Sequence, residues 1–195
     1  FIFPSTDAHN SEYVADHWKG REWISGFDGS AGVAVVTMHG AALWTDSRYF
    51  LAAEKQLGGT EFQLMKLKMP GTPTLAEWIG SQLDGNSEVG VDGTVNSYSF
   101  VENLISDLRH EGGITVRLNL DPLKFIWKDR PSIPNNKVVI QPLEYTGEDT
   151  RSKITRIKSE LHKIHCDGML VSALDDIAWI LNLRGTDVHC NPVFV

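Results

Sequence analysis

The sequence has few cysteines, no long apolar run and no cluster of basic residues. Its two cysteines, Cys166 and Cys190, and the absence of any Asn-x-Ser/Thr sequon favour a reducing, cytoplasmic location over a disulfide-stabilised secreted fold. No segment approaches the roughly 18 apolar residues needed to span a bilayer, so no membrane partner is expected. With 18 Lys and Arg against 25 Asp and Glu, the net charge is −7. No nucleic-acid partner is therefore expected, since binding phosphates needs clustered cations.

The short motifs that mark many active sites are also missing. The chain contains neither His-Glu-x-x-His nor a Gly-x-Ser-x-Gly elbow. Gly26, Gly29 and Gly32 resemble a phosphate loop only weakly, because a strand follows them instead of a helix, and a tight turn is favoured. His162, His165 and Cys166 match no common zinc spacing, and the sequence predicts no metal site there.

What the sequence does contain is an alternation of strand-like and helix-like segments, which predicts an α/β fold with a mixed sheet. Asp46 is predicted to be the N-cap of the helix that follows it. The predicted strands cover residues 1–3, 33–37, 41–44, 61–67, 89–92, 114–118, 138–143 and 169–172. The predicted helices cover residues 18–25, 47–57, 74–83, 97–111, 151–164 and 177–181.

The pattern restarts near residues 143–148, where an amphipathic helix leads into a strand, an Asp and a second helix. The same order of elements follows the N-terminus, so one unit is used twice. This predicts a first domain over residues 1–144 and the beginning of a second over residues 145–195. The first copy lacks the leading helix and the second is too short to complete its sheet, so we expect both ends to be cut.

One strand-to-helix junction carries charged side chains, in the block Trp44-Thr45-Asp46-Ser47-Arg48-Tyr49-Phe50. Arg48 could be an ordinary surface residue beside a capping aspartate. Alternatively, its guanidinium is a five-donor fork aimed from the sheet edge at a carbonyl or carboxylate. Spacing alone favours the first interpretation.

Several segments together resemble the N-terminal half of the three-domain Xaa-Pro aminopeptidases, also called aminopeptidase P. The resemblance extends in order along essentially the whole chain. It lies in residues 4–13, 24–32, 44–50, 91–92, 126–131, 172–179, 182–188 and 191–194.

The resemblance implies a creatinase-like N-terminal domain with a six-stranded mixed sheet flanked by helices, followed by the start of a second similar domain. In that family, a third, pita-bread domain holds two metal ions, usually manganese, on two Asp, one His and two Glu. That region is absent here, so the resemblance implies no catalytic residue and no metal ligand in this chain. The chain alone is then expected to be inactive, as the non-catalytic part of an enzyme that releases the residue before an N-terminal proline.

One role carries over by resemblance, because the Arg of this strand-to-helix block is associated with binding substrate peptide and corresponds to Arg48. The position before it is usually Gly in the family and is Ser47 here. The partners implied are proline-containing peptides, and a homodimer is an open alternative for the incomplete second domain. Two rival interpretations remain: a protein-binding module like a histone-chaperone subunit with the same architecture, and a prolidase or creatinase, which usually have one N-terminal domain.

Overall fold

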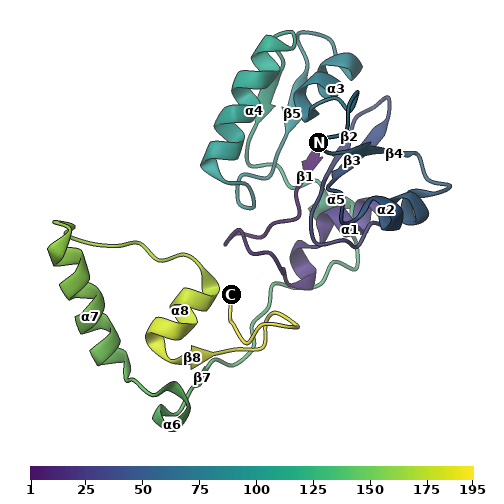
Figure 1. Cartoon of the computed structure of the whole chain (residues 1–195). Coiled ribbons are helices and arrows are strands. Elements are labelled where there is room, and N and C mark those ends of the chain that lie inside the picture. The colour runs from purple at the N-terminus through teal and green to yellow at the C-terminus, as the bar shows by residue number, and fades with distance from the viewer. The chain divides into compact units, whose positions relative to one another are not determined.

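A computed structural model describes all residues of the chain, 1–195, and shows two compact units, Phe1–Pro131 and Ser132–Val195 (Figure 1). Each unit is an α/β arrangement with its own buried residues, which confirms the predicted fold class. The units divide earlier than the 144/145 boundary that the sequence indicated. The reason is that the strand Val139–Ile140 pairs with a strand near the C-terminus, so residues 132–144 belong with the second unit.

The first unit is built on six strands, but they form sheets of four and two strands instead of one sheet of six. In the larger sheet β1 pairs antiparallel with β2, β2 antiparallel with β3, and β3 parallel with β4. A single parallel bridge, Ile2 to Val91, connects the larger sheet to the parallel pair β5–β6. Because β1 is only two residues long, it provides no further pairing to β5. The strands are β1 (Ile2–Phe3), β2 (Val33–Val36), β3 (Ala41–Thr45), β4 (Phe62–Lys66), β5 (Glu88–Gly90) and β6 (Thr115–Arg117).

Helices cover both faces of the larger sheet, because alternate strand residues point to opposite sides. Ile2, Val35 and Trp44 pack with residues of α3 and α4, whereas Phe3, Ala34 and Leu43 pack with residues of α2 and α5. Figure 1 shows these helices on opposite sides of the strands. The helical segments of this unit are the 3₁₀ turn η1 (Asp16–Trp18), α1 (Gly20–Ser25), α2 (Phe50–Leu57), α3 (Leu75–Gln82), α4 (Tyr98–His110) and α5 (Leu123–Ile126).

Local capping explains where α3 and α4 of this unit start. Thr74 and Glu77 form a capping box, in which the Thr74 hydroxyl accepts the Glu77 amide at 3.2 Å and the Glu77 carboxylate accepts the Thr74 amide at 2.6 Å. The Ser97 hydroxyl accepts the Phe100 amide at 3.2 Å in the same way. These helices begin within a residue of the predicted position.

Two pairs of tryptophans hold helical segments of this unit, and all of these rings except Trp23 are buried. Trp44 of β3 meets Trp78 of α3 edge to face, with centroids 5.6 Å apart, and its indole N–H donates to the Pro73 carbonyl at 2.9 Å. Trp23 of α1 stacks on Trp127, which follows α5, with centroids 5.2 Å apart and planes at 17°. These four tryptophans therefore pack between elements that are distant in sequence.

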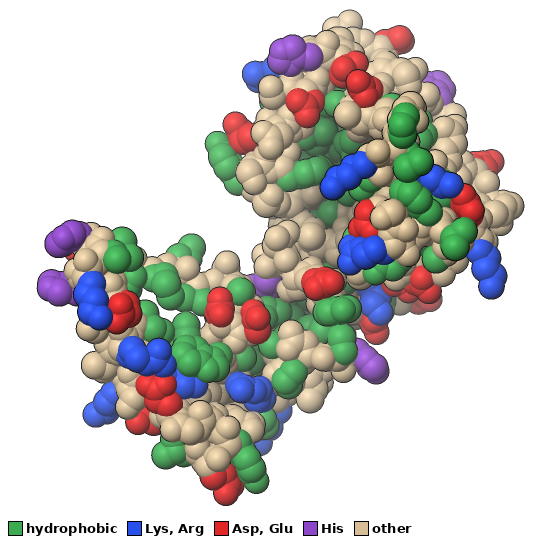
Figure 2. Space-filling view, viewed as in Figure 1, with side chains coloured by type: hydrophobic (Ala, Val, Ile, Leu, Met, Phe, Trp, Pro, Cys, Tyr) green, Lys and Arg blue, Asp and Glu red, His purple; other side chains and the backbone are tan.

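The second unit is smaller and more open. Four buried residues form its core, namely Leu174, Ala178, Val188 and Val193. Its elements are β7 (Val139–Ile140), α6 (Leu143–Thr146), α7 (Thr150–Lys163), α8 (Leu174–Leu181) and β8 (Leu183–Arg184), with β7 antiparallel to β8. Hydrophobic side chains are exposed over this unit (Figure 2).

The strand predicted at residues 169–172 is absent from the structure. Leu170 there is 94% exposed and Met169 is 55% exposed. The prediction was wrong because strand geometry needs a partner for its backbone groups, and no neighbouring strand lies beside this segment. An apolar, β-prone run alone does not create that partner.

A buried lysine joins α7 to the end of α8. Lys153 is 2% exposed, and its ammonium donates to the Trp179 carbonyl at 2.8 Å and to Asn182 Oδ1 at 2.7 Å. The ammonium also lies 4.2 Å from the centroid of the Trp179 ring, at cation–π distance. Asn182 in turn donates to the Glu148 carbonyl at 2.9 Å. This polar network therefore fixes α7 on α8 in a unit with few buried apolar residues.

None of the helices combines the length and the apolar composition that crossing a bilayer requires.

Candidate functional site

The residues with the clearest functional indication lie in the turn between β3 and α2, here called the Arg48 turn (Asp46–Ser47–Arg48–Tyr49). β3 ends at Thr45, whose buried hydroxyl donates to the Ala31 carbonyl at 2.6 Å. The Tyr49 amide donates to the Asp46 carbonyl at 3.0 Å, which closes the turn. The prediction that Arg48 stands at a strand-to-helix junction is confirmed.

The prediction that Asp46 caps the helix is wrong. α2 begins at Phe50, its N-cap residue is Tyr49, and no side chain caps it. The Asp46 carboxylate is occupied instead by Arg48, whose amide donates to Oδ1 at 3.0 Å, with Nε to Oδ1 at 2.9 Å and Nη2 to Oδ2 at 2.8 Å. The Asp46 side chain therefore closes a short-range turn. Aspartate favours such turns as well as helix N-caps, so the residue type alone does not distinguish the two.

The pairing changes the acid–base behaviour of both groups. The hydrogen bond from the Arg48 side chain lowers the pKa of Asp46 below its ordinary value, and Asp46 conversely raises the pKa of Arg48. Both side chains remain in contact with solvent, with Arg48 60% and Asp46 34% exposed. The carboxylate and the guanidinium are therefore both charged at neutral pH. Because the two charges have opposite signs and are in contact, they largely cancel for any group that approaches the pair.

The ring of Tyr49 packs against the Arg48 guanidinium. Its ring centroid lies 5.2 Å from Arg48 Cζ, and its hydroxyl is 2.8 Å from the Ser30 hydroxyl. The Phe27 and Tyr49 rings meet edge to face, with centroids 5.8 Å apart and an angle of 81° between their planes. These contacts join the Arg48 turn to the glycine-rich loop at residues 26–32, so the two segments that the sequence analysis singled out lie side by side.

The glycine-rich loop connects α1 to β2 and is folded around a buried arginine. Arg21 is 6% exposed; its Nη1 donates to the Phe27 carbonyl at 2.9 Å and its Nη2 to the Gly29 carbonyl. Burial lowers the pKa of Arg21 from its ordinary value. The loop therefore directs carbonyl oxygens inward at a cation, which is the opposite of the amide-lined cradle that binds phosphate.

Gly29 is required where the loop meets the Arg48 turn. A Cβ at this position would lie 2.3 Å from Phe27 Cζ and 2.8 Å from Tyr49 Cδ1. Any side chain here would therefore displace the ring that supports Arg48.

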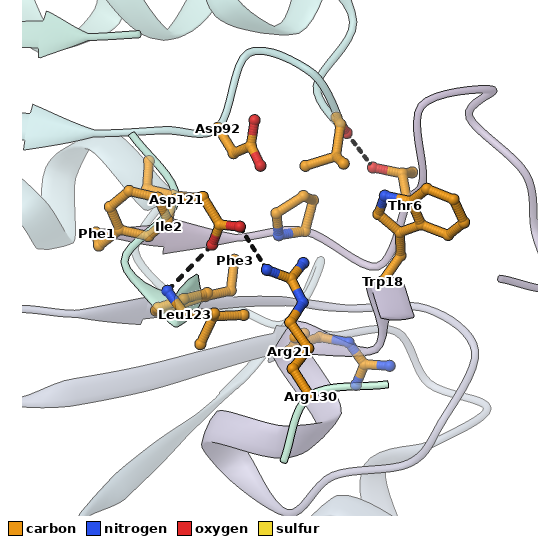
Figure 3. Close-up of a pocket in the computed structure, with 13 residues that line it drawn as sticks. Phe1, Ile2, Phe3, Thr6, Trp18, Arg21, Asp92, Asp121, Leu123 and Arg130 are labelled. Atoms are coloured by element: carbon orange, nitrogen blue, oxygen red, sulfur yellow. Dashed lines mark hydrogen bonds and ion pairs between the residues drawn. The ribbon is translucent and has the colours of Figure 1, made fainter. Parts of the chain in front are cut away.

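A second charged cluster lines a pocket beside β1 that holds about 350 Å³, including its open mouth (Figure 3). The Asp121 carboxylate accepts the Leu123 amide at 3.0 Å and forms an ion pair with Arg130. Arg130 Nε also donates to the His17 carbonyl at 2.9 Å. Because these charges are paired with one another and with backbone groups, their evident role is to fix the segment that contains α5 against η1.

The sequence did not reveal the two buried charged residues of the first unit, Arg21 and Asp7. Arg21 was not singled out, since nothing in its local sequence distinguishes it from a surface arginine. Asp7 is 1% exposed, and its Oδ1 accepts the amides of His9 and Ser11, each at 2.9 Å. Its other oxygen, Oδ2, is buried without a hydrogen-bond partner. Asp7 lies within residues 4–13, one of the segments that resemble the aminopeptidase family, and this was the one indication in the sequence that it matters.

The histidines and cysteines do not converge on a metal site. Cys166 and Cys190 are exposed and unbridged. No group of three or more His, Cys, Asp or Glu side chains is placed to hold a metal ion.

Comparison with known proteins now gives the family. Residues 13–116 match the creatinase/prolidase N-terminal domain, and residues 129–195 match a second form of that domain. The chain belongs to the creatinase/prolidase N-terminal domain family. Both the Arg48 turn and the glycine-rich loop fall within the first match.

Relatives of this creatinase-type chain extend the match to its full length. It is 46% identical over 198 residues to a probable Xaa-Pro aminopeptidase P of Fusarium vanettenii, covering 100% of this chain and 32% of the relative. It is 44% identical over 197 residues to aminopeptidase P2 of Arabidopsis thaliana, covering 99% of this chain and 27% of that protein.

A solved structure agrees with these relatives. The X-prolyl aminopeptidase of Caenorhabditis elegans, described as a cytosolic enzyme with a di-nuclear active site, superposes with a TM-score of 0.86 at 36% identity. The superposition covers 98% of this chain and 31% of that enzyme. This creatinase-type chain therefore spans about a third of the length of the proteins that it matches.

Proposed function

We propose that this chain is the N-terminal, non-catalytic region of a metal-dependent aminopeptidase that releases the residue preceding a proline. The observation that carries the proposal is the similarity over the whole chain to proteins named Xaa-Pro aminopeptidase P, at 46% identity for one relative. Such peptides call for a dedicated enzyme, because proline's tertiary amide lacks an N–H and its ring restricts the backbone. Residues 132–195 are, in this proposal, the beginning of a second domain of the creatinase type.

In this function Arg48 contacts the peptide substrate from outside the metal centre. Its guanidinium is 60% exposed and Asp46 restrains it on one side, so little conformational entropy is lost when it binds. Its remaining donors suit a carbonyl or carboxylate oxygen.

The metal chemistry of the proposed enzyme belongs to residues outside this chain. The Caenorhabditis elegans relative is described as having a di-nuclear active site, and we propose two manganese ions for the whole enzyme. The residues of this chain do not fit such a centre, because no three potential ligands converge. The chain alone is accordingly expected to be inactive. Its proposed partners are proline-containing peptides, its proposed location is the cytoplasm, and homodimerisation is the proposed assembly.

The test is hydrolysis of a peptide beginning Arg-Pro-Pro by this chain and by the full-length protein, each with added Mn²⁺. Cleavage by the full-length protein alone is the expected result. Cleavage by this chain alone would show that the catalytic residues lie within it. Absence of cleavage by both would favour the protein-binding module, the rival interpretation.

A further inference from the structure

The Arg48 guanidinium has five N–H donors, and the structure shows how many remain for a ligand. Nε and one N–H of Nη2 are taken by Asp46, at 2.9 and 2.8 Å. No hydrogen bond joins Nη1 to the rest of the chain. The donors that remain lie at the outer end of the guanidinium, away from Asp46.

The charge at that outer end is not that of a free arginine. Asp46 lies in direct contact with the guanidinium, and the Glu12 carboxylate is near enough to favour its charged form as well. The positive charge of Lys68 contributes to the lowered pKa of Asp46. A ligand that approaches Arg48 therefore meets a cation largely balanced by the carboxylate of Asp46, with which it is in direct contact. A neutral carbonyl oxygen loses little by this, whereas a carboxylate is repelled by Asp46.

The turn also keeps the guanidinium from rotating to meet different ligands. The Arg48 amide is bound to the same carboxylate at 3.0 Å, and the Tyr49 ring lies under the guanidinium. Tyr49 is held by the Ser30 hydroxyl at 2.8 Å. The guanidinium therefore keeps its two hydrogen bonds to Asp46 while a ligand meets only the outer donors.

We propose that the Asp46–Arg48 pair selects a neutral backbone carbonyl of an extended peptide and disfavours a terminal carboxylate placed at the same point. Asp46 is then a positioning and specificity residue, and it acts through Arg48. This inference rests on the proposed function, because it requires Arg48 to meet the substrate. The preferred substrates are then peptides that extend beyond the residue in contact with Arg48, so that their C-terminal carboxylate lies farther along the peptide.

The test uses the full-length enzyme and matched peptides with proline second, each made as a free acid and as a C-terminal amide, from three to six residues. For the length that places the last residue at Arg48, the wild type is expected to prefer the amide. Asp46→Asn is expected to reduce that amide preference in kcat/KM by roughly two- to fivefold, the effect of one exposed charge. For the longest peptides, acid and amide are expected to be cleaved alike by both enzymes.

Two further variants separate the possible failures. Asp46→Glu keeps the charge and is expected to keep the amide preference even where kcat/KM falls, which a merely structural role for Asp46 would not predict. If Asp46→Asn leaves the acid-to-amide ratio unchanged at every length while Arg48→Ala still lowers kcat/KM, this inference is overturned and the proposed role of Arg48 stands. If Arg48→Ala changes the kinetics of no peptide, the proposed role itself fails.

Discussion

Asp46 holds Arg48 by three hydrogen bonds, two from the guanidinium and one from the backbone amide. An arginine fixed in this way offers a ligand a defined set of donors in a defined direction, which is the requirement for productive substrate orientation. The sequence places Asp46 and Arg48 two positions apart, yet only the structure shows that they bind each other.

Replacing Arg48 by Ala in the full-length enzyme is expected to lower kcat/KM by roughly ten- to a hundredfold, because a charged hydrogen bond to the substrate is lost. Metal content should be unchanged, because a guanidinium is not a metal ligand and no group of residues in this chain is placed to hold a metal ion. Steady-state kinetics and metal analysis check this. Arg117 is the matched control, since it is also 60% exposed and is paired with Glu88 at 2.7 Å. Equal losses in Arg48→Ala and Arg117→Ala would contradict a specific role.

Replacing Gly29 by Ala is expected to destabilise the first unit by about 1–3 kcal/mol, as overpacking usually does. The new Cβ would lie 2.3 Å from Phe27 Cζ, and that ring supports Tyr49. Denaturant unfolding of the chain measures the change. Gly93→Ala is the control, because the nearest atom to its Cβ would lie 3.7 Å away, at ordinary contact distance. A stable Gly29→Ala protein would mean that the loop relaxes freely.

Replacing Lys153 by Met is expected to destabilise the second unit by about 1–3 kcal/mol, because the Trp179 carbonyl and Asn182 Oδ1 each lose a donor. Met retains most of the buried stem, so the loss reports the ammonium. Amide hydrogen exchange of residues 132–195, which reports the second unit separately, gives the readout. Lys163→Met is the control, because that side chain is 64% exposed in its pair with Glu160. A more stable Lys153→Met protein would show that burying the ammonium costs more than its hydrogen bonds return.

The capping box of α3 should make the stability of the folded chain depend on pH in the acidic range. Hydrogen bonds from the Thr74 amide and hydroxyl lower the pKa of Glu77 in the folded chain. Glu77 therefore contributes stability above its unfolded pKa, and this contribution is lost as the pH falls through the lower folded value. Glu77→Gln should weaken the decline in stability between neutral and acidic pH. Melting temperatures of both proteins across that range provide the check, and parallel curves would count against the capping role.

Much of the first unit could be predicted because its signals are local. Thr74 and Ser97 mark helix starts through bonds made within three residues, and alternation along the strands follows from a buried sheet. Asp46 shows the limit of such signals, since an Asp after a strand suits a turn as well as a cap. The strand expected at residues 169–172 failed for a non-local reason, because it had no partner to pair with.

The candidate site was predictable only in part. The position of Arg48 at the strand-to-helix junction followed from the sequence, and its importance came from the resemblance. Its support by Ser30 and Tyr49 depends on tertiary contacts. Arg21 could not have been recognised, because its carbonyl partners in the glycine-rich loop acquire their positions only when the loop folds.

The paired tryptophans of the first unit have an optical consequence. Indole rings as close as those of Trp44 and Trp78, or of Trp23 and Trp127, exchange excitation energy and so produce coupled bands in the far-ultraviolet circular dichroism. Such bands depend on the mutual orientation of two rings and vanish once the packing loosens, even where the helices persist. The first unit thus carries an intrinsic signal for side-chain order that is separate from its secondary structure.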